Sequence, residues 1–308
     1  MKRSTVAWGL GGLGCLGLLT VVAAFVLWLG ETAGGGGAGI APGPFALGGR
    51  VGVVDLEGVI LSGDHVRETL DRFREAGNVK AVVLRINSPG GGVAASQEIY
   101  REVGRFRKET GKPVVVSMES VAASGGYYAA AGADHILANP GTITGSIGVI
   151  VQWTNYADLL EWAKLRTVTF KSGALKDAGN PTRALSDEDR QFFEELVAAM
   201  LAQFRHAVTE GRKNRLKPGA MDRIADGRVI TGEEALALGF VDEIGDYRDA
   251  VDRAARLAGM SVPAEVWHPR KGRPGLLELL TGPSESSVAG RLMSGAPVGG
   301  GWNAFYLW

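Results

Sequence analysis

The residues best suited to covalent chemistry are one serine and two lysines. Ser124 lies in a run of mostly small residues, Val121–Tyr128, where a loop is expected to enter a helix. Lys171 and Lys176 follow in a segment that also contains small residues. A serine hydroxyl becomes a nucleophile when a base accepts its proton, and a neutral amine can be that base. The pattern therefore indicates nucleophilic catalysis with a lysine base.

The same residues have structural interpretations, which the sequence leaves open. A serine before a helix commonly caps it, and most lysines are solvated surface residues. A histidine base is the competing catalytic hypothesis. Of the four histidines, only His65 is placed to serve a triad, because the others lie in an expected strand, a long helix and near the tail: His135, His206 and His268.

A glycine run could supply the second part of such a site. Asn87–Gly92 stands where an apolar strand is expected to end and a helix to begin. Ligands of α/β sheets sit beyond the carboxyl ends of strands, and free backbone N–H groups there can hold developing negative charge. The run is either an oxyanion loop or a tight turn.

Composition excludes several other classes of protein. Lys and Arg together number 33, as do Asp and Glu, and the basic residues are scattered. This does not match the electrostatic footprint of a nucleic-acid binder. The single cysteine, Cys15, lies in an apolar run, so no disulfide framework or thiolate metal site is expected. No cluster of His, Asp and Glu suggests a metal site either.

The order of apolar and amphipathic segments predicts an α/β fold. Strands and helices alternate at the lengths typical of βαβ units. Strands are expected over Val51–Leu56, Val79–Ile86, Val114–Met118, Asp134–Ala138 and Thr167–Lys171. Helices are expected over Val66–Glu75, Val93–Glu109, Gly126–Ala131, Tyr156–Lys164, Ser186–Arg212 and Thr231–Gly239.

The chain is expected to consist of five parts. Residues 6–29 carry no charge and are long enough to cross a bilayer. Lys2 and Arg3 precede them, which predicts a cytoplasmic N-terminus (residues 1–5) and a catalytic domain on the extracytoplasmic side of the cell membrane. The alternative is a cleaved secretory signal. A Gly-rich linker (30–49), the folded domain (50–262) and a flexible tail (263–308) complete the chain.

Several motifs together resemble the signal peptide peptidase A family, membrane-bound serine proteases related to the Clp protease and crotonase folds. The resemblance covers roughly residues 50–260. The segments that carry it are Asn87–Gly91, Ala123–Tyr128, Thr144–Gly148, Gly173–Lys176 and the closing motif Gly239–Glu243. It implies a fold of repeated ββα units.

The resemblance also implies roles for individual residues. Ser124 would be the nucleophile, Lys176 the general base and Ser146 the residue that orients the lysine. Gly91 and Gly125 would donate the N–H groups of the oxyanion hole. The resemblance implies no cofactor. Lys171 is the rival base, but the family's lysine stands three residues after the glycine, as Lys176 does after Gly173.

The family has a long form with two related halves and a short form with one, and this chain resembles the short form. It would therefore form a homo-oligomeric ring in which Lys176 of one subunit reaches Ser124 of the next. The implied substrates are signal-peptide remnants and other apolar peptides. The aromatic residues of 302–308 would contact the lipid interface, enter a neighbour's groove as a product-like peptide, or simply be exposed.

Three alternative functions fit parts of the pattern. A crotonase-type acyl-CoA enzyme would share the fold, but would not need Ser124 beside a lysine or a membrane anchor. A membrane scaffold on a protease fold would bind partners without cutting them, although the catalytic residue types are present. A stomatin-operon protease would use a similar serine and lysine, but generally has a long multi-spanning C-terminal region.

Overall fold

The computed structural model describes residues 49–269 and 304–306. The predicted membrane helix, residues 6–29, and nearly all of the predicted linker lie outside these ranges. Within the described part of the chain, no helix combines the length and the apolar character needed to cross a bilayer.

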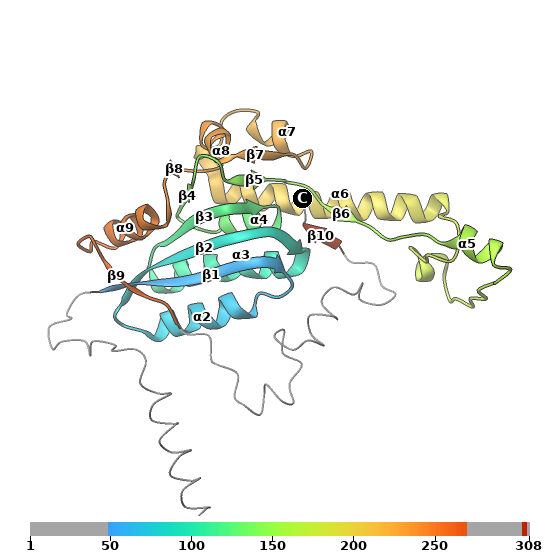
Figure 1. Cartoon of the computed structure of the whole chain (residues 1–308), viewed down its shortest axis with the longest axis horizontal. Helices are drawn as coiled ribbons and strands as arrows, with labels where there is room; N and C mark the ends of the chain where they lie inside the picture. The colour runs from blue at the N-terminus through green and yellow to red at the C-terminus, as the bar shows by residue number, and fades with distance from the viewer. Residues whose placement is uncertain (1–48, 270–303, 307–308) are drawn as a thin grey trace, which may run out of the picture. The chain divides into compact units, whose positions relative to one another are not determined.

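The described residues form a mixed α/β structure (Figure 1). The strands are β1 (Arg50–Ile60), β2 (Val79–Gly92), β3 (Val114–Ala123), β4 (His135–Ala138), β5 (Ile143–Gly145), β6 (Ile150–Val151), β7 (Val229–Thr231), β8 (Glu243–Ile244), β9 (Glu265–Trp267) and β10 (Ala304–Tyr306). The α-helices are α2 (Asp64–Glu75), α3 (Val93–Thr110), α4 (Gly125–Ala130), α5 (Ala157–Trp162), α6 (Asp187–Arg212), α7 (Ala220–Ile224), α8 (Gly232–Leu238) and α9 (Tyr247–Leu257). Two short 3-10 helices are η1 (Ala174–Asp177) and η2 (Lys213–Arg215).

The centre of the fold is a parallel sheet. Strand β2 pairs with β1 on one edge and β3 on the other, and β3 pairs in turn with β4, which pairs with β8. Helices α2, α3 and α4 connect the first four strands (Figure 1). Parallel strands need such crossovers because their ends lie at opposite edges of the sheet. The predicted α/β fold is confirmed at this level.

Both faces of the sheet are covered, which explains why its strands read as continuous apolar runs. Alternate residues of β2 enter two different cores: Val82, Leu84 and Ile86 pack in the cluster with α2, α3 and α4, whereas Ala81 and Val83 pack with α9. All five are fully buried. Burial of a Val, Leu or Ile side chain stabilises a fold by about 1.5–3 kcal/mol, so β2 is a major source of stability.

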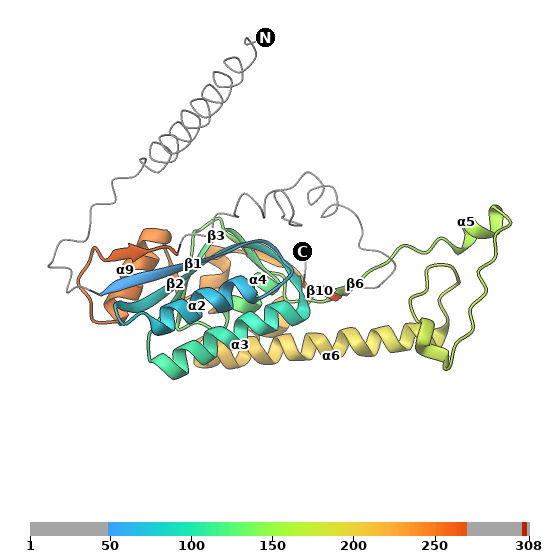
Figure 2. The same cartoon turned by 90° about the horizontal axis from the view of Figure 1, so that it is seen from below.

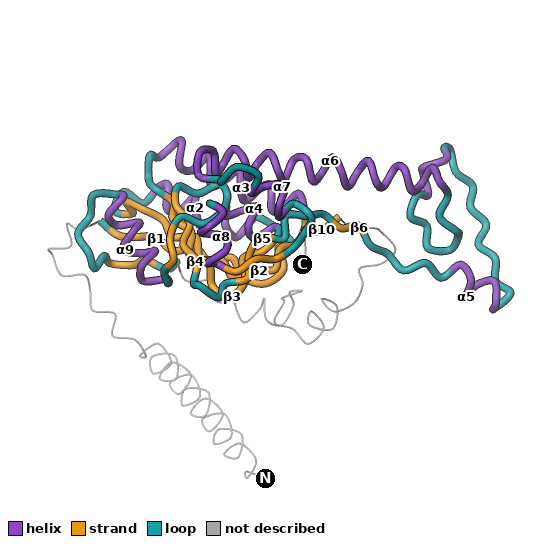
Figure 3. Tube along the Cα trace, turned by 90° about the horizontal axis from the view of Figure 1, so that it is seen from above, coloured by secondary structure: helices purple, strands orange, loops and turns teal. Residues whose placement is uncertain are grey.

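The segment between β6 and α6 differs from the prediction. Thr167–Lys171, predicted as a strand, has no regular secondary structure. Val168 and Phe170 are 75% and 95% exposed, and no strand of the described residues pairs with them. A strand without a partner leaves its backbone groups unpaired. The alternation of apolar residues in this segment was therefore not sufficient to predict a strand. Figures 2 and 3 show this segment and α5 beside the N-terminal end of α6, away from the central strands.

The folded part also continues beyond the predicted boundary at residue 262. Strand β9 pairs in parallel with the start of β1, from Arg50↔Glu265 to Gly52↔Trp267. Residues 304–306 form β10, which pairs with β2 and β6. Parts of the segment predicted to be a flexible tail therefore belong to the sheet.

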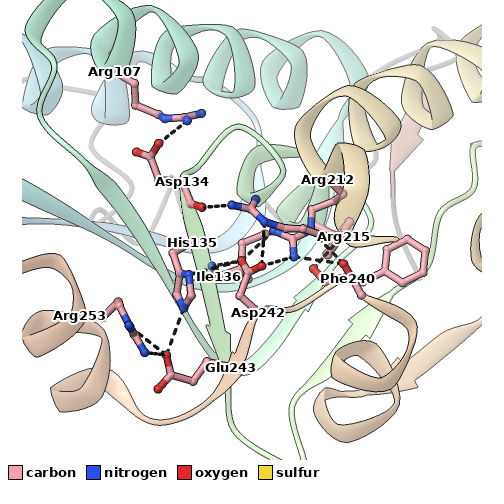
Figure 4. A network of polar contacts seen from close by, with 12 residues as sticks. Arg107, Asp134, His135, Ile136, Arg212, Arg215, Phe240, Asp242, Glu243 and Arg253 are labelled. Carbon is pink, nitrogen blue, oxygen red and sulfur yellow. Dashed lines mark hydrogen bonds and ion pairs between the residues drawn. The ribbon is translucent and has the colours of Figure 1, made fainter. Parts of the chain in front are cut away.

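A buried ion pair joins the C-terminal end of α6 to the sheet (Figure 4). Arg212, whose side chain is fully buried, donates two hydrogen bonds to the carboxylate of Asp242, at 2.8 and 2.7 Å. Arg212 also donates to the carbonyl of Gly239, and Asp242 accepts from the backbone N–H of Ile136 in β4. The closing motif Gly239–Glu243 is therefore held between helix and sheet by charge.

This pair makes the fold sensitive to acid. Burial alone would raise the pKa of Asp242, but the Arg212 guanidinium, together with the Ile136 N–H and the Arg215 charge, more than offsets it, and the pKa lies below its usual range. A carboxyl group with a lowered pKa stabilises the fold above its unfolded pKa, about 4 for Asp, and loses this effect as pH falls through the folded value.

Replacing Asp242 should be strongly destabilising. Asp242→Asn leaves the Arg212 charge buried without its counter-charge, and we expect the free energy of unfolding in urea to fall by about 3–5 kcal/mol. The control is Asp226→Asn, because the Asp226–Arg228 pair is more than half exposed and should cost less than about 1 kcal/mol. Equal losses in the two variants would contradict the role given to the buried pair.

Candidate active site

Ser124 occupies a sharp turn between a strand and a helix. Strand β3 ends at Ala123 and α4 begins at Gly125. Ser124 has φ 52° and ψ −116°, a backbone conformation that side-chain-bearing residues rarely adopt and that costs about 1–3 kcal/mol. Its N–H donates to the Gly145 carbonyl at 2.9 Å and its carbonyl accepts from Tyr128 at 2.8 Å. The surrounding backbone therefore holds the strained turn in place.

The Ser124 hydroxyl is buried and unpaired. The residue is 0% exposed, and in the part of the chain that the structure describes its Oγ has no hydrogen-bond partner. Ser124 stands at the N-cap position of α4, but its side chain makes no capping bond. The structural interpretation as a helix cap is therefore wrong. A buried hydroxyl without a partner costs about 1–3 kcal/mol, so this side chain is placed at the expense of stability.

The two predicted oxyanion glycines lie next to each other. A Cβ added to Gly125 would stand 3.2 Å from the backbone nitrogen of Gly91 and 2.3 Å from the Oγ of Ser96. Gly125 begins a helix, where backbone N–H groups are free to bind an oxyanion. The structure thus places Gly91 close to Gly125, the residue that follows Ser124.

The glycine run around Gly91 is an extension of a strand. Strand β2 continues through Asn87–Gly92 and α3 begins directly after it. Gly91 pairs with Ile60 of β1, so closely that an added Cβ would stand 2.2 Å from the Ile60 carbonyl oxygen. The tight-turn interpretation is therefore wrong: the glycines permit close approach of backbones.

Two serines that the sequence analysis did not single out support this strand end. Ser88 donates to the Gly58 carbonyl at 2.6 Å and accepts from the N–H of Gly90 at 3.1 Å. Ser96 donates to the Gly92 carbonyl at 2.9 Å. Ser88 lies inside the glycine run, and Ser96 lies one helical turn after it. These positions are the signal by which the sequence could have identified the two serines.

Ser146 and Ser124 follow the ends of two paired strands. Strand β5 pairs in parallel with the end of β3, with Ala123 opposite Gly145, so each serine is the next residue after a paired one. Ser146 is also buried, 2% exposed, and has a positive φ of 50°. Its N–H donates to the Arg228 carbonyl at 2.8 Å. Both serines therefore leave the same edge of the sheet through constrained turns.

The two candidate bases differ in their surroundings. Lys171 donates to the carboxylate of Asp177 at 2.6 Å and to the Ala174 carbonyl at 2.8 Å. The amine of Lys171 is therefore already engaged within its own segment. Lys176 is exposed in η1, and among the described residues its side chain makes no hydrogen bond or ion pair. The Ser124 Oγ has no hydrogen-bond partner in residues 49–269, so neither lysine of this part of the chain is hydrogen-bonded to it.

Arg183 fixes η1 to the start of α6. It binds Asp177 at 3.0 Å and Asp189 at 3.0 Å. Hydrogen bonds from Arg183 and then from Lys171 hold the pKa of Asp177 well below its usual range. Asp189 completes a capping box with Ser186 at the first turn of α6, as the sequence predicted in part. Lys176 is therefore carried on a segment braced against a helix.

Comparison with known proteins shows which family this chain resembles. The model of peptidase family S49 matches residues 106–261, about half of the chain. An Enterococcus faecium protein with the name "Putative signal peptide peptidase SppA" is 41% identical over 183 residues, covering 59% of this chain and 52% of that protein. Protease 4 of Salmonella typhi is 38% identical over 234 residues, 73% of this chain and 37% of that protein. The chain thus spans about half or less of the length of these relatives.

A third relative carries the word serine in its name. "Serine protease SPPA, chloroplastic" of Arabidopsis thaliana is 32% identical over 240 residues, covering 77% of this chain and 35% of that protein.

The close approach at Gly91 gives a test of the site's architecture. Gly91→Ala would place a methyl group against the Ile60 backbone, and we expect the free energy of unfolding in urea to fall by about 2 kcal/mol or more. Gly104 lies in α3, and none of the described atoms stands within 4 Å of a Cβ added there. Gly104→Ala should therefore raise the free energy of unfolding by about 0.5–1 kcal/mol. A Gly91→Ala protein as stable as the parent would show that the backbones are not this close.

Proposed function

The chain belongs to peptidase family S49, and from this membership we propose that it is a serine endopeptidase with a Ser–Lys dyad that degrades cleaved signal peptides and other apolar peptides at a membrane. The observation that carries the proposal is the Ser124 hydroxyl, buried and unpaired at a strained turn beside the glycines Gly91 and Gly125. The names of the relatives support the substrate class.

The proposed reaction uses Ser124 and Lys176 in two steps. In the first, neutral Lys176 accepts the hydroxyl proton while Oγ attacks the scissile carbonyl, and the protonated lysine then gives that proton to the leaving amine. In the second, water releases the acyl group with the lysine again as base. The N–H groups of Gly91 and Gly125 would stabilise the oxyanion of each tetrahedral intermediate, by about 3 kcal/mol per donor. Ser146 would orient the lysine.

We assign Lys176 to the active site of a neighbouring subunit. Among the described residues the Ser124 Oγ has no hydrogen-bond partner, and Lys176 lies on an exposed segment. The same segment exposes large apolar side chains, among them Trp162 at 79% and Phe170 at 95%. Exposed apolar groups of this size are typical of protein interaction sites. This supports a homo-oligomeric ring with shared active sites.

The finer details of fold and location are also part of the proposal. The parallel order of β1 to β4 with intervening helices supports the Clp protease/crotonase-like fold. Residues 6–29 would be the single membrane-spanning helix. The N-terminus would then be cytoplasmic and the catalytic domain extracytoplasmic.

The dyad can be tested by initial rates on a Leu-rich fluorogenic peptide, using the full chain in detergent. We expect Ser124→Ala and Lys176→Ala each to lose about 10⁴-fold or more in kcat, because members of a catalytic unit fail together. Lys171→Ala is the matched control, and its rate should stay within about threefold of wild type. Loss in Lys171→Ala with retention in Lys176→Ala would assign the base to Lys171. Equal rates in all variants would exclude the dyad.

Shared sites predict complementation between inactive chains. Mixed rings of Ser124→Ala and Lys176→Ala chains should regain activity, because some interfaces combine an intact serine with an intact lysine. Mixed assembly is checked by pulling down one chain through a tag carried by the other. Verified mixed rings without activity would contradict a lysine supplied by the neighbour.

A further inference from the structure

A basic hollow is lined by the C-terminal turns of α3 and α6. Its volume is about 700 Å³. Among the described residues that line it, five side chains are basic and one is acidic: Arg101, Arg107, Arg212, Lys213 and Arg215 against Glu210. A concave surface with one sign of charge attracts ions of the other sign. The lining therefore favours an anion.

The hollow lies at the edge of the sheet opposite to the nucleophile. Asp134, directly before β4, is bonded to two of the lining arginines (Figure 4): its carboxylate accepts from Arg107, and its carbonyl accepts from Arg215 at 2.8 Å. Strands β1 to β4 are parallel, so all four begin at this edge. Ser124 follows the far end of β3. The hollow is therefore separate from the proposed active site.

The floor of the hollow consists of small residues that let its walls approach closely. A Cβ added to Gly211 of α6 would stand 2.0 Å from the carbonyl oxygen of Ala131. A Cβ added to Gly132 would stand 2.9 Å from the carbonyl oxygen of Tyr100 in α3. Long basic side chains thus line a floor of backbone and small side chains.

Three of the arginines hold the fold, but one of them keeps an unused donor. Arg212 binds Asp242, as described above, and Arg107 donates to the carbonyl of Gly132 at 2.5 Å. The Nε of Arg107 is buried and has no hydrogen-bond partner among the described residues. A buried donor without a partner is unfavourable, and an anionic oxygen bound in the hollow is the kind of partner that it lacks.

The other two cations have little part in holding the fold. Among the described residues, no hydrogen bond or ion pair is made by the side chain of Arg101. Lys213 approaches only Glu210, at 3.8 Å, and both side chains are more than half exposed. Lys213 also has a positive φ of 28°, which side-chain-bearing residues rarely adopt and which is typical of functional sites. Two cations are therefore available to a ligand.

We propose that this hollow binds the phosphate of an anionic phospholipid headgroup. Arginine binds phosphate oxygens through paired hydrogen bonds, and lysine adds a point charge. Even when Asp134 and Asp242 are counted with Glu210, the site carries two more cations than carboxylates. Basic pockets of this kind recognise lipid headgroups at membrane surfaces.

The choice of a lipid over free phosphate rests on the proposed membrane location. Arg50, the first residue of β1, stands at the same edge of the sheet as the hollow. Residues 30–49 separate it from the predicted membrane helix, and a flexible linker of this length spans about 25 Å. The edge that carries the hollow is therefore within reach of the bilayer.

Binding can be measured by calorimetry on the full chain carrying Ser124→Ala, in a neutral detergent. The probes are dihexanoyl phosphatidylglycerol, dihexanoyl phosphatidylcholine and inorganic phosphate. We expect the phosphatidylglycerol to bind at least about tenfold more tightly than either of the others. Equal Kd values for the two lipids would overturn the inference, and so would inorganic phosphate binding as tightly as the anionic lipid.

Matched double variants test whether the hollow is the site. Arg101→Gln with Lys213→Gln removes the two available cations and should raise the Kd for phosphatidylglycerol about tenfold. The control, Arg72→Gln with Arg248→Gln, removes the same charge from exposed positions in α2 and α9 and should stay within about twofold. Equal losses in the two double variants would show that overall charge, and not the hollow, binds the lipid.

A bilayer measurement places the site at the membrane. Hydrogen exchange of segments 100–107 and 211–216 is compared for the full Ser124→Ala chain in nanodiscs of phosphatidylcholine, with and without one third phosphatidylglycerol. We expect at least about threefold slower exchange in the anionic discs, because a bound headgroup stabilises both segments. Unchanged exchange would overturn the inference. All these chains are inactive by design, so the outcome does not depend on whether the wild-type protein cleaves peptides.

Discussion

The site depends on one backbone constraint, the parallel pairing of β3 with β5 up to Ala123 and Gly145. The hydrogen bond from the Ser124 N–H to the Gly145 carbonyl extends this pairing by one step. It fixes the turn at Ser124 and places Ser146 as the next residue on the neighbouring strand. The positive φ values at Ser124 and Ser146 persist because hydrogen bonds to the carbonyls of Gly145 and Arg228 hold the two backbones in place.

Close backbone packing provides the second part of the site. Gly91 lies against Ile60 on one side and near Gly125 on the other, and at both glycines an added Cβ would collide with a neighbour. Backbone N–H groups at these positions can face a ligand because no side chain covers them. The same absence of side chains makes the position of these groups insensitive to rotamer changes, which favours a preorganised oxyanion site.

The sequence predicted local features well and long-range pairing poorly. The apolar run Val79–Ile86 marked the central strand, but the strand continues through glycines that composition alone interprets as a turn. The proximity of Ser146 to Ser124 follows from pairing between β3 and β5, which no local pattern reveals, and only the family resemblance pointed to it. Thr167–Lys171 has the alternation of a strand without a partner. Strand β10 is too short to be recognised, and its pairing joins residues more than 150 positions apart. The role of Lys176 stays a prediction.

Because Arg183 joins η1 to the start of α6, the length of that helix fixes how far the lysine-bearing segment lies from the core. Arg183 holds the lysine-bearing segment at Asp189, in the first turn of α6, and the helix enters the core at Phe204. The 15 residues between these points span about 22 Å at 1.5 Å per residue. If the lysine serves a neighbouring subunit, this fixed length would set how far apart consecutive nucleophiles stand. An insertion of one helical turn in α6 would lengthen the helix by about 5.4 Å. Lys176 would then no longer align with Ser124 of the neighbouring subunit, although neither residue had changed.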